Sequence, residues 1–513
     1  MTTADPSRAQ PPESYWLTRF AILRLLGCVY AVAFLAAARQ ILPLIGSHGL
    51  LPLDSFLSRV QTALGSTAAG FCRLPSVFWF AHSDAVLQAA AWAGLALSLM
   101  VVAGYANALV MAALWALYLS FVHLGQDWYG YGWEIQLLET GFLAIFLCPL
   151  VDGRPFPKRA PPRVVLWLFR WLIFRIMLGA ALIKLRGDVV WRDLTALYYH
   201  FETQPLPNPL SRWFHFLPRW ILKGGVLFNY LAELIAPLFA FYPRIARHIA
   251  GVVMVLFQLV LIVSGNLSFL NWLTMVPALA CFDDSFWARL LPQALTRRAA
   301  AAAMAAQPSL PLQRAAWVLA TIVGLLSVQP VVNLISPRQI MNTSFDPLDL
   351  VNTYGAFGSV GHDRLNVVFQ GTDAETPDSR AVWKDYPYVA LPVALDQRPR
   401  QIAPYQPRLD WQMWFAAMGT LEQYPWTVHL VWKLLHNDPG ALSLLGPNPF
   451  PQHPPHYVRA VLYRYQFVRP GAPTDAWWRR EDLGLWLPPL SVDDPRLLSV
   501  LVRAGWLEAP PGQ

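Results

Sequence analysis

A cluster of ionisable side chains follows one of the apolar stretches of the chain and is the first candidate for chemistry. Lys184 ends the apolar stretch, and Asp188, Asp193, His200 and Glu202 come after it. Ionisable groups at a membrane pair with one another and mark functional sites. A desolvated lysine can act as a base. The cluster therefore predicts either a membrane enzyme with Lys184 as base and the other residues as ion partners, or a salt-bridged cap whose lysine reaches the lipid headgroups.

Further charged residues interrupt the apolar segments and are candidates for the interior of a helical bundle. They are Arg24, Glu134, Glu139, Arg170, Arg175 and Glu233. The two acids Glu134 and Glu139 lie about one helical turn apart, as do the two arginines of the next segment. Neighbouring antiparallel helices would let these charges pair; the alternative is a polar cavity for a substrate. His123, Asp127 and Glu134 match no established metal-ligand spacing, so neither a metal nor a cofactor is predicted.

The C-terminal third offers aromatic residues and arginine instead of catalytic motifs. It contains no Gly-x-Ser-x-Gly, Gly-x-Gly-x-x-Gly or His-Glu-x-x-His sequence. Trp, Tyr and Arg dominate the hot spots of protein interfaces, so two short stretches are candidates for binding a client protein. Their residues are Arg408, Asp410, Trp411, Trp414, Trp477 and Trp478. The alternative is an ordinary core in which these side chains make local contacts.

The composition indicates a membrane protein. Of the 513 residues, 55% are hydrophobic and only 14% are charged, whereas soluble domains carry about 25% charged residues. The net charge of +8 is not gathered into the patch that nucleic-acid binding requires. The four cysteines form no Cys-x-x-Cys pair, which argues against zinc, redox and disulfide frameworks. Positive charge carried by Arg more than Lys, with many Ala and Pro, suggests a GC-rich genome and hence a bacterium.

The apolar pattern predicts the elements that must position these residues. A spanning helix needs about 20 mostly apolar residues, and about nine stretches approach that length. They are 20–38, 86–103, 106–122, 133–150, 164–184, 225–242, 249–264, 269–281 and 315–335. The sequence therefore predicts an α-helical multi-span membrane bundle over residues 20–335, preceded by a cytoplasmic segment over residues 1–19.

The distribution of basic residues predicts which side each end of the chain occupies. Arg and Lys concentrate in 151–163, 243–247 and 289–314, and loops rich in these residues face the cytoplasm. With nine spans, residues 336–513 are then exported. The segment 185–224, which is also basic, works against this topology.

The exported region is predicted to be a compact α+β or β-rich domain. Residues 367–369 and 457–467 are rich in aromatic and β-branched side chains, as strands are. Residues 409–435 are typical of one or two amphipathic helices, and Pro and Gly interrupt most of the remainder.

Several sequence blocks from both halves of the chain, in family order, resemble the lipase maturation factor family. The blocks are 184–188, 191–195, 199–209, 352–359, 407–415, 448–450 and 477–478. In the loop after residue 185 the matching residues are Arg186, Gly187, Asp188, Trp191, Arg192, Asp193, Glu202, Gln204, Pro205, Asn208 and Pro209.

This resemblance implies a function that composition does not show. Family members are multi-span proteins, best known from the endoplasmic reticulum, that help secreted lipases to fold and assemble. Their C-terminal region faces the lumen and contacts the client. For this chain the resemblance implies a multi-pass protein without a catalytic step, in the endoplasmic reticulum of a eukaryote or the inner membrane of a bacterium. Its partners would be the lipid bilayer and a secreted lipase or other exported client, with no nucleic acid.

A more distant likeness supports the alternative function. Lys184 and Leu185, with Asp188 and Trp191 behind them, resemble a segment of vitamin K-dependent gamma-carboxylase. In that enzyme a lysine at the start of the segment acts as the base that activates a reduced quinone. The likeness implies an enzyme acting on a lipid or quinone, with Lys184 as base and Asp188, His200 and Glu202 as its partners. A transporter is less favoured, because the halves show no inverted repeat.

Overall fold

The computed structural model of the protein describes residues 13–507. The first 12 residues of the predicted cytoplasmic segment and the last six of the predicted exported region lie outside the described residues. Within residues 13–507, six helical segments are long and apolar enough to cross a membrane. They are α1 (Trp16–Ile45), α4 (Asp84–Ala103), α7 (Arg163–Arg186), the segment Arg219–Phe241, α12 (Arg244–Ser264) and the segment Leu310–Ile335.

The prediction of nine spans is not confirmed, although all nine apolar stretches contain helices. The three shorter ones are α5 (Ala108–Leu124), α6 (Gly132–Ile145) and the segment Leu270–Cys281, which begins as α13 (Leu270–Ala278). An α-helix rises 1.5 Å per residue, so the 14 residues of α6 cover about 21 Å of a hydrocarbon layer about 30 Å thick. Ten of the 14 residues of α6 are buried, so most of its side chains face other parts of the protein.

Two of the segments combine several helical pieces. Arg219–Phe241 consists of α11 (Arg219–Tyr230), the π-helical turn η4 (Leu231–Ile235) and the 3-10 turn η5 (Ala236–Phe241). Leu310–Ile335 consists of α16 (Leu310–Leu326) and α17 (Val328–Ile335). Short helices connect the long ones: α2 (Leu53–Leu64), α3 (Thr67–Arg73), α8 (Val189–Arg192), α9 (Leu197–Thr203), α10 (Ser211–His215), α14 (Asp284–Trp287) and α15 (Gln293–Met304).

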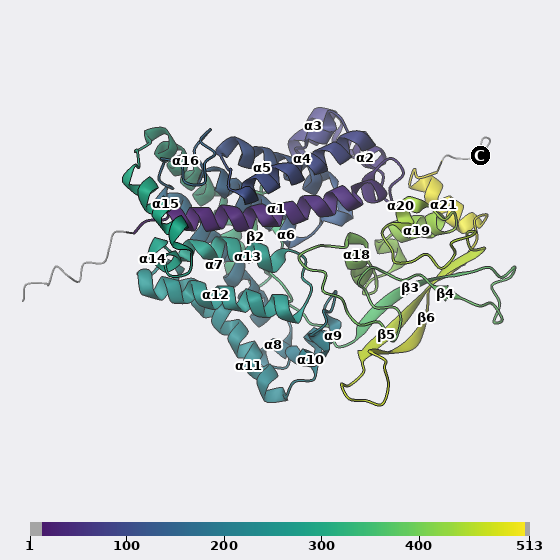
Figure 1. The fold of residues 1–513 in the computed structure, drawn as a ribbon. Helices are drawn as coiled ribbons and strands as arrows, with labels where there is room; N and C mark the ends of the chain where they lie inside the picture. The colour runs from purple at the N-terminus through teal and green to yellow at the C-terminus, as the bar shows by residue number, and fades with distance from the viewer. Residues whose placement is uncertain (1–12, 508–513) are drawn as a thin grey trace, which may run out of the picture.

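The basic loops gather at the end of the bundle where α1 begins. Arg159 donates to the carbonyl oxygen of Pro308 at 2.8 Å, which joins two of these loops. Arg244, in the third, pairs with Asp283 at 2.8 Å. In Figure 1, α14 and α15 lie at this end, and the C-terminal strands lie at the opposite end. The basic segments that were expected to share one side of a membrane are therefore neighbours.

The C-terminal region combines a small sheet with helices. The sheet is antiparallel with the order β4-β3-β5-β6, and a separate pair joins β1 (Thr343–Ser344) to β2 (Asn352–Thr353). Its strands are β3 (Arg364–Thr372), β4 (Lys384–Asp385), β5 (Tyr457–Phe467) and β6 (Trp478–Leu490). The helices are α18 (Arg408–Ala416), α19 (Trp426–Leu434), α20 (Pro439–Leu442) and α21 (Pro495–Arg503). Strands were predicted within β3 and β5, and both are present.

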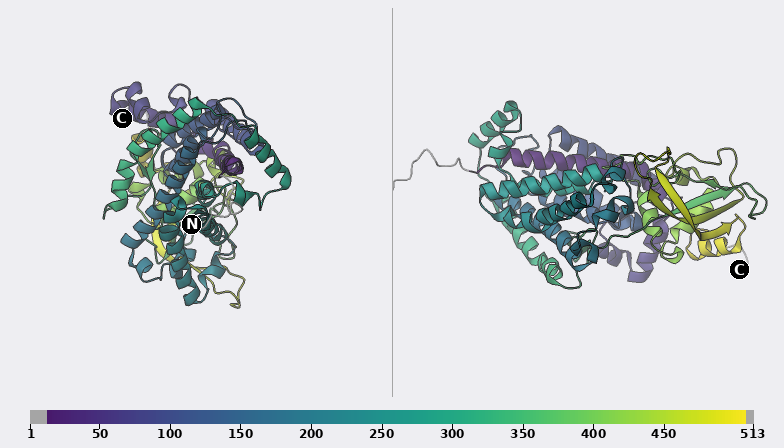
Figure 2. Two further views of the ribbon diagram at one scale, coloured as in Figure 1. Left: turned by 90° about the vertical axis from the view of Figure 1, so that its left-hand side faces the viewer. Right: turned by 90° about the horizontal axis from the view of Figure 1, so that it is seen from below.

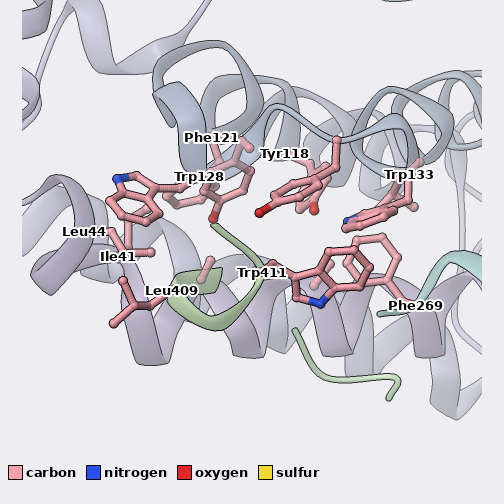
Figure 3. Packing of buried hydrophobic residues seen from close by; sticks show 14 of the residues in the cluster. Ile41, Leu44, Tyr118, Phe121, Trp128, Trp133, Phe269, Leu409 and Trp411 are labelled. Atoms are coloured by element: carbon pink, nitrogen blue, oxygen red, sulfur yellow. The ribbon is translucent and has the colours of Figure 1, made fainter. Parts of the chain in front are cut away.

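One hydrophobic core runs from the bundle into the C-terminal region. Figure 3 shows Trp411 and Leu409 of α18 among side chains of the bundle, including Trp133 and Phe269. The rings of Trp133 and Trp411 are 4.8 Å apart between centroids. The right-hand view of Figure 2 shows helices at one end of the elongated molecule and the sheet at the other. Helix α18 therefore lies at the junction between the two parts.

Candidate functional site

Lys184 lies in the last turn of α7 and is 3% exposed. Its ammonium is 2.6 Å from one carboxylate oxygen of Glu233 and 2.7 Å from the other, and it donates to Asn229 Oδ1 at 3.0 Å. Asn229 also donates to Glu233, at 2.9 Å. The π-helical turn η4 carries Glu233. The ammonium is thus held by a carboxylate and an amide oxygen, both from the segment Arg219–Phe241.

The predicted ion partners of Lys184 have other contacts. Asp188 caps α8 by accepting from the backbone N–H of Val190 at 3.2 Å. Asp193 is exposed. Glu202 accepts from the backbone N–H of Phe467 at 2.6 Å, which attaches the loop to β5. His200 lines the same cavity as Lys184, but no hydrogen bond joins the two side chains among the described residues. Glu233 was predicted for the bundle interior, not as the partner of this lysine.

The loop motif of the family resemblance attaches the bundle to the C-terminal region. Its backbone carbonyls at Glu202, Gln204 and Pro205 accept from the guanidinium of Arg364 at 3.0, 2.6 and 3.1 Å. The Gln204 side chain donates to Ser264 O at the end of α12 at 3.1 Å. Arg364, the first residue of β3, is 1% exposed. Sequence reasoning missed this arginine, because three carbonyl acceptors leave no motif in the sequence.

The charges inside the bundle pair in two ways. Arg175 of α7 pairs with Glu139 of α6, as expected for neighbouring helices. Glu134 instead pairs with Arg408 of the C-terminal region, whose Nη1 is 2.9 Å from Glu134 Oε1. Both side chains of this second pair have no measurable exposure, and Tyr118 also donates to Glu134. The bundle and the C-terminal region are therefore joined by a buried ion pair.

Arg170, the second arginine of α7 that was predicted to pair with an acid of the neighbouring helix, makes other contacts. Arg170 donates to the backbone oxygen of Ala280 at 2.9 Å and to the hydroxyl of Tyr15 at 3.1 Å. Arg24 likewise donates to backbone oxygens, at Val101 and Gly104. These two arginines therefore satisfy carbonyls at helix ends and pair with no acid in the described residues.

The residues predicted to bind a client do not form one exposed surface. Arg408, Asp410, Trp411 and Trp478 are all buried, because α18 packs against the bundle and Trp478 stacks on Phe467 with centroids 4.2 Å apart. Arg408 contacts Glu134 and not Asp410. These four side chains therefore fit the alternative interpretation, in which they belong to an ordinary core.

Asp410 holds the backbone instead of reaching a partner protein. It accepts from the N–H groups of Ala390 and Leu391 at 2.6 and 2.9 Å. Burial raises the pKa of this carboxyl to about 6, although the backbone N–H groups act in the opposite direction.

Trp414 and Trp477 are the half-buried members of the predicted set. The Trp477 ring lies under the guanidinium of Arg212, with 4.6 Å from the guanidinium carbon to the ring centroid. Trp414 donates from its indole to Thr203 O at 3.1 Å. Client binding at these two residues stays a prediction.

A cavity of about 500 Å³ is lined by residues of the bundle helices and of α18. Lys184, Glu233 and His200 line it, together with Trp133 and Trp411. His200 is nine-tenths buried, and burial together with the nearby charge of Lys184 lowers the pKa of its imidazole to about 4. The imidazole is therefore neutral near pH 7. Among residues 13–507, no three His, Cys, Asp or Glu residues are arranged to hold a metal ion.

Comparison with known protein families gives matches in both halves of the chain. The lipase maturation factor transmembrane domain family matches residues 17–289. The lipase maturation factor C-terminal domain family matches residues 350–488. The two matched ranges contain Lys184, Glu233, Arg364 and Arg408.

Individual relatives match over nearly the whole length. The chain is 48% identical to lipase maturation factor 1 of Bos taurus over 509 residues, which cover 94% of this chain and 90% of the relative. It is also 48% identical to lipase maturation factor 1 of Homo sapiens, with 94% and 89% covered. Lipase maturation factor 2 of Xenopus tropicalis is 28% identical, with 97% and 85% covered. No solved structure matches the chain.

Proposed function

Because this chain belongs to the lipase maturation factor family, we propose that it helps a secreted lipase to fold and assemble at a membrane. The observation that carries the proposal is the 48% identity to lipase maturation factor 1 over 94% of the chain. The relatives' names support this role, and the six candidate spans make the chain a multi-pass membrane protein.

The part of the chain that meets the client is proposed to be the C-terminal region, residues 336–513, on the side opposite the cytoplasm. Two features support this arrangement. The basic loops joined by Arg159 and Arg244 gather at the opposite end of the molecule, and basic loops remain in the cytoplasm. The C-terminal region carries exposed apolar side chains, among them Leu483 and Leu485 of β6. The compartment is then the lumen of the endoplasmic reticulum or the periplasm.

The role is proposed to be that of a folding factor without a catalytic step. Lys184 is not favoured as a base, because Glu233 pairs with it at 2.6 Å. The ion pair of Arg408 with Glu134 and the hydrogen bonds of Arg364 to backbone carbonyls hold the C-terminal region on the bundle. A binding surface on that region would therefore stay at a constant distance from the membrane. Trp414 and Trp477 are proposed as client contacts on that surface.

Co-expression with a lipase tests the proposal. Cells that lack their own maturation factors would produce a secreted dimeric lipase with this chain, with an empty vector, or with lipase maturation factor 1 as the positive control. We expect the specific activity of the secreted lipase to rise with this chain while the amount of lipase messenger RNA stays constant. Unchanged activity, with the chain present in the membrane in normal amount, would refute a role in lipase maturation.

The sidedness needs a separate measurement. A protease added to sealed microsomes or to intact spheroplasts reaches only one face of the membrane. For spheroplasts the C-terminal region should be digested, and for sealed microsomes it should be protected, because it is proposed to face away from the cytoplasm in both. The opposite pattern would contradict the proposed topology without affecting the family assignment.

A further inference from the structure

The cavity between the bundle and α18 has the dimensions and lining of a ligand site. Its volume of about 500 Å³ lies within the range of about 300–1,000 Å³ that is usual for small-molecule sites. Met177 of α7, Phe257 and Leu261 of α12, and Phe415 of α18 give it apolar walls. The loop over residues 354–361 lines it as well. The site therefore combines walls from helices at the level of the membrane with walls from the C-terminal region.

Most polar groups in the lining are already paired with one another. Gln136 donates to the hydroxyl of Thr274 at 3.1 Å, and Asn271 donates to Gln258 at 2.8 Å. The Lys184 ammonium is balanced by the Glu233 carboxylate. A ligand would therefore meet these walls mainly through hydrocarbon contacts, and a charged group would find no unbalanced counter-charge among them. Charge without a partner is costly to bury, so the cavity favours an uncharged ligand.

Three side chains in the lining, those of Tyr131, His200 and Trp411, carry polar groups without a hydrogen-bond partner among the described residues. The ring nitrogens of His200, which is 7% exposed, make no hydrogen bond, and its ring contacts Phe357 edge-on at 4.8 Å between centroids. The indole N–H of Trp411, which is 3% exposed, also lacks an acceptor. Buried polar groups in proteins are almost always hydrogen-bonded. A neutral imidazole offers one donor and one acceptor, and an indole offers one donor, so both suit ligand oxygens.

One wall of the cavity lies beside the surface that lipid contacts. Val260 of α12 lines the cavity and is 43% exposed. Apolar neighbours on the same flank, among them Leu256 and Val263, are exposed too. Exposed apolar side chains on a spanning helix face the hydrocarbon. The cavity can therefore receive an acyl chain from the membrane past α12.

We propose that this cavity binds one uncharged acyl lipid, of the acylglycerol class, drawn from the surrounding membrane. The acyl chain lies along Met177, Phe257 and Leu261, and the ester or hydroxyl oxygens bind His200 and Trp411. The inference stands apart from the lipase maturation role, because it concerns occupancy of the cavity and no client protein takes part.

Photo-crosslinking with a defined lipid tests the proposal. The purified full chain would be placed in phosphatidylcholine vesicles that contain a diacylglycerol with a diazirine in one acyl chain. After irradiation we expect labelled peptides from α7, α12 and α18, which line the cavity. Unlabelled diacylglycerol should compete, and phosphatidic acid of the same chains should compete less. Labels confined to the outward faces of the spans, or stronger competition by phosphatidic acid, would overturn the proposal.

Variants that fill the cavity supply the specific control. Ala180 and Ala356 line it from opposite parts, and Ala180→Phe or Ala356→Phe should each reduce labelling about tenfold, because an added ring occupies the ligand's volume. Ala93→Phe adds the same ring at an exposed position of α4 and should leave labelling unchanged. His200→Leu should weaken labelling while keeping the cavity filled to a similar extent.

Each variant must elute as a single species. Because Ala180→Phe and Ala356→Phe fill the cavity from different walls, the test can still be made if one of the two variants is unstable. If the soluble cavity-filling variant is labelled as strongly as Ala93→Phe, the lipid does not occupy this cavity.

Discussion

The guanidinium of Arg408, in the C-terminal region, forms an ion pair with the carboxylate of Glu134, in the membrane bundle, at 2.9 Å. Both side chains have no measurable exposure. Arg408 also lies over the ring of Tyr129, with its guanidinium carbon 3.5 Å from the ring centroid. A residue predicted to contact a client is thus a structural link between the two halves of the chain.

Removing one member of this pair should destabilise the whole protein. Breaking a buried ion pair costs about 3–5 kcal/mol, because the remaining charge loses its partner. We therefore expect Arg408→Met to lower the unfolding temperature strongly, and the double change Arg408→Met/Glu134→Gln to recover part of the loss. Arg154→Ala removes an exposed pair with Asp152 and should leave the unfolding temperature nearly unchanged. A loss for Arg408→Met as small as for this control would contradict the structural link.

The second link, at Arg364, should require a guanidinium and not merely a positive charge. Arg364 reaches three backbone carbonyls with two nitrogens, and an ammonium cannot reproduce that planar fork. We expect Arg364→Lys to destabilise the protein by about 1–3 kcal/mol, measured as the shift of the thermal unfolding curve. Arg338→Lys, at an exposed position, is the matched control. Equal curves for both variants would show that the fork contributes nothing.

Lys184 separates the structural from the enzymatic role. Lys184→Met leaves Glu233 buried without its cation, so the amount of protein in the membrane should fall. Lys184→Met/Glu233→Gln removes both charges and should restore the amount and the maturation of the co-expressed lipase. If instead Lys184→Met accumulates normally but the co-expressed lipase is inactive, the result would support the enzymatic role of Lys184.

Trp477 and Trp478 are neighbours in sequence with different surroundings. Trp478 is 1% exposed, and replacing a buried aromatic residue by alanine costs about 3–5 kcal/mol. Trp478→Ala should therefore reduce the amount of protein, whereas Trp477→Ala should keep it. Trp477→Ala should nevertheless reduce the secreted lipase activity per molecule of this protein, because Trp477 is proposed to contact the client. Normal lipase activity with Trp477→Ala would exclude this contact.

Acid should destabilise the protein through buried histidines. Burial lowers the pKa of His429 to about 4, against the effect of its hydrogen bond with Leu50 O; the unfolded chain has a histidine pKa of about 6.5. Between these values the unfolded state binds more protons, so stability is full above pH about 6.5 and declines toward pH about 4. His200 and His215 act in the same direction. Asp410, with its raised pKa, opposes them between about 3.8 and 6.

The measurement for this prediction is the unfolding temperature from pH 7 to pH 4.5. It should fall with pH for the unmodified chain. His429→Asn keeps a donor for the Leu50 carbonyl but does not titrate, so the decline should become shallower. The same pH dependence in both proteins would mean that His429 does not contribute to it.

The parts of the fold that could be predicted from the sequence follow from local periodicity. Nine apolar stretches predicted helices, and helices are present in all of them, because long apolar runs have few alternatives. Which of them can cross the membrane depends on helix length and packing. Helix α6 (Gly132–Ile145) illustrates the difference, because it has only 14 residues and ten of them are buried. Strand β5 (Tyr457–Phe467) was predictable from its aromatic and β-branched residues.

Charge pairs could be predicted only where the two residues lie on helices that follow one another in the sequence. Arg175 and Glu139 lie on consecutive apolar helices, and their pairing was expected. Glu134 meets Arg408, which is 274 residues away, and no local pattern indicates that contact. The same limit applies to Lys184. Its partner Glu233 was predicted to lie in the bundle interior, but the contact between the two residues was not predicted. Trp is a residue type typical of interface hot spots, which made Trp411 a candidate for client contact. The junction between the bundle and the C-terminal region is built from the same residue types.

The distance along the chain between Glu134 and Arg408 sets an order of assembly during synthesis. A ribosome adds roughly 5–20 residues per second. Arg408, which lies 274 residues after Glu134, is therefore synthesised roughly 14–55 seconds later than Glu134. Until then the carboxylate of Glu134 lacks the guanidinium that it contacts in the finished chain. A copy that ends before Arg408 never forms this contact between the bundle and the C-terminal region.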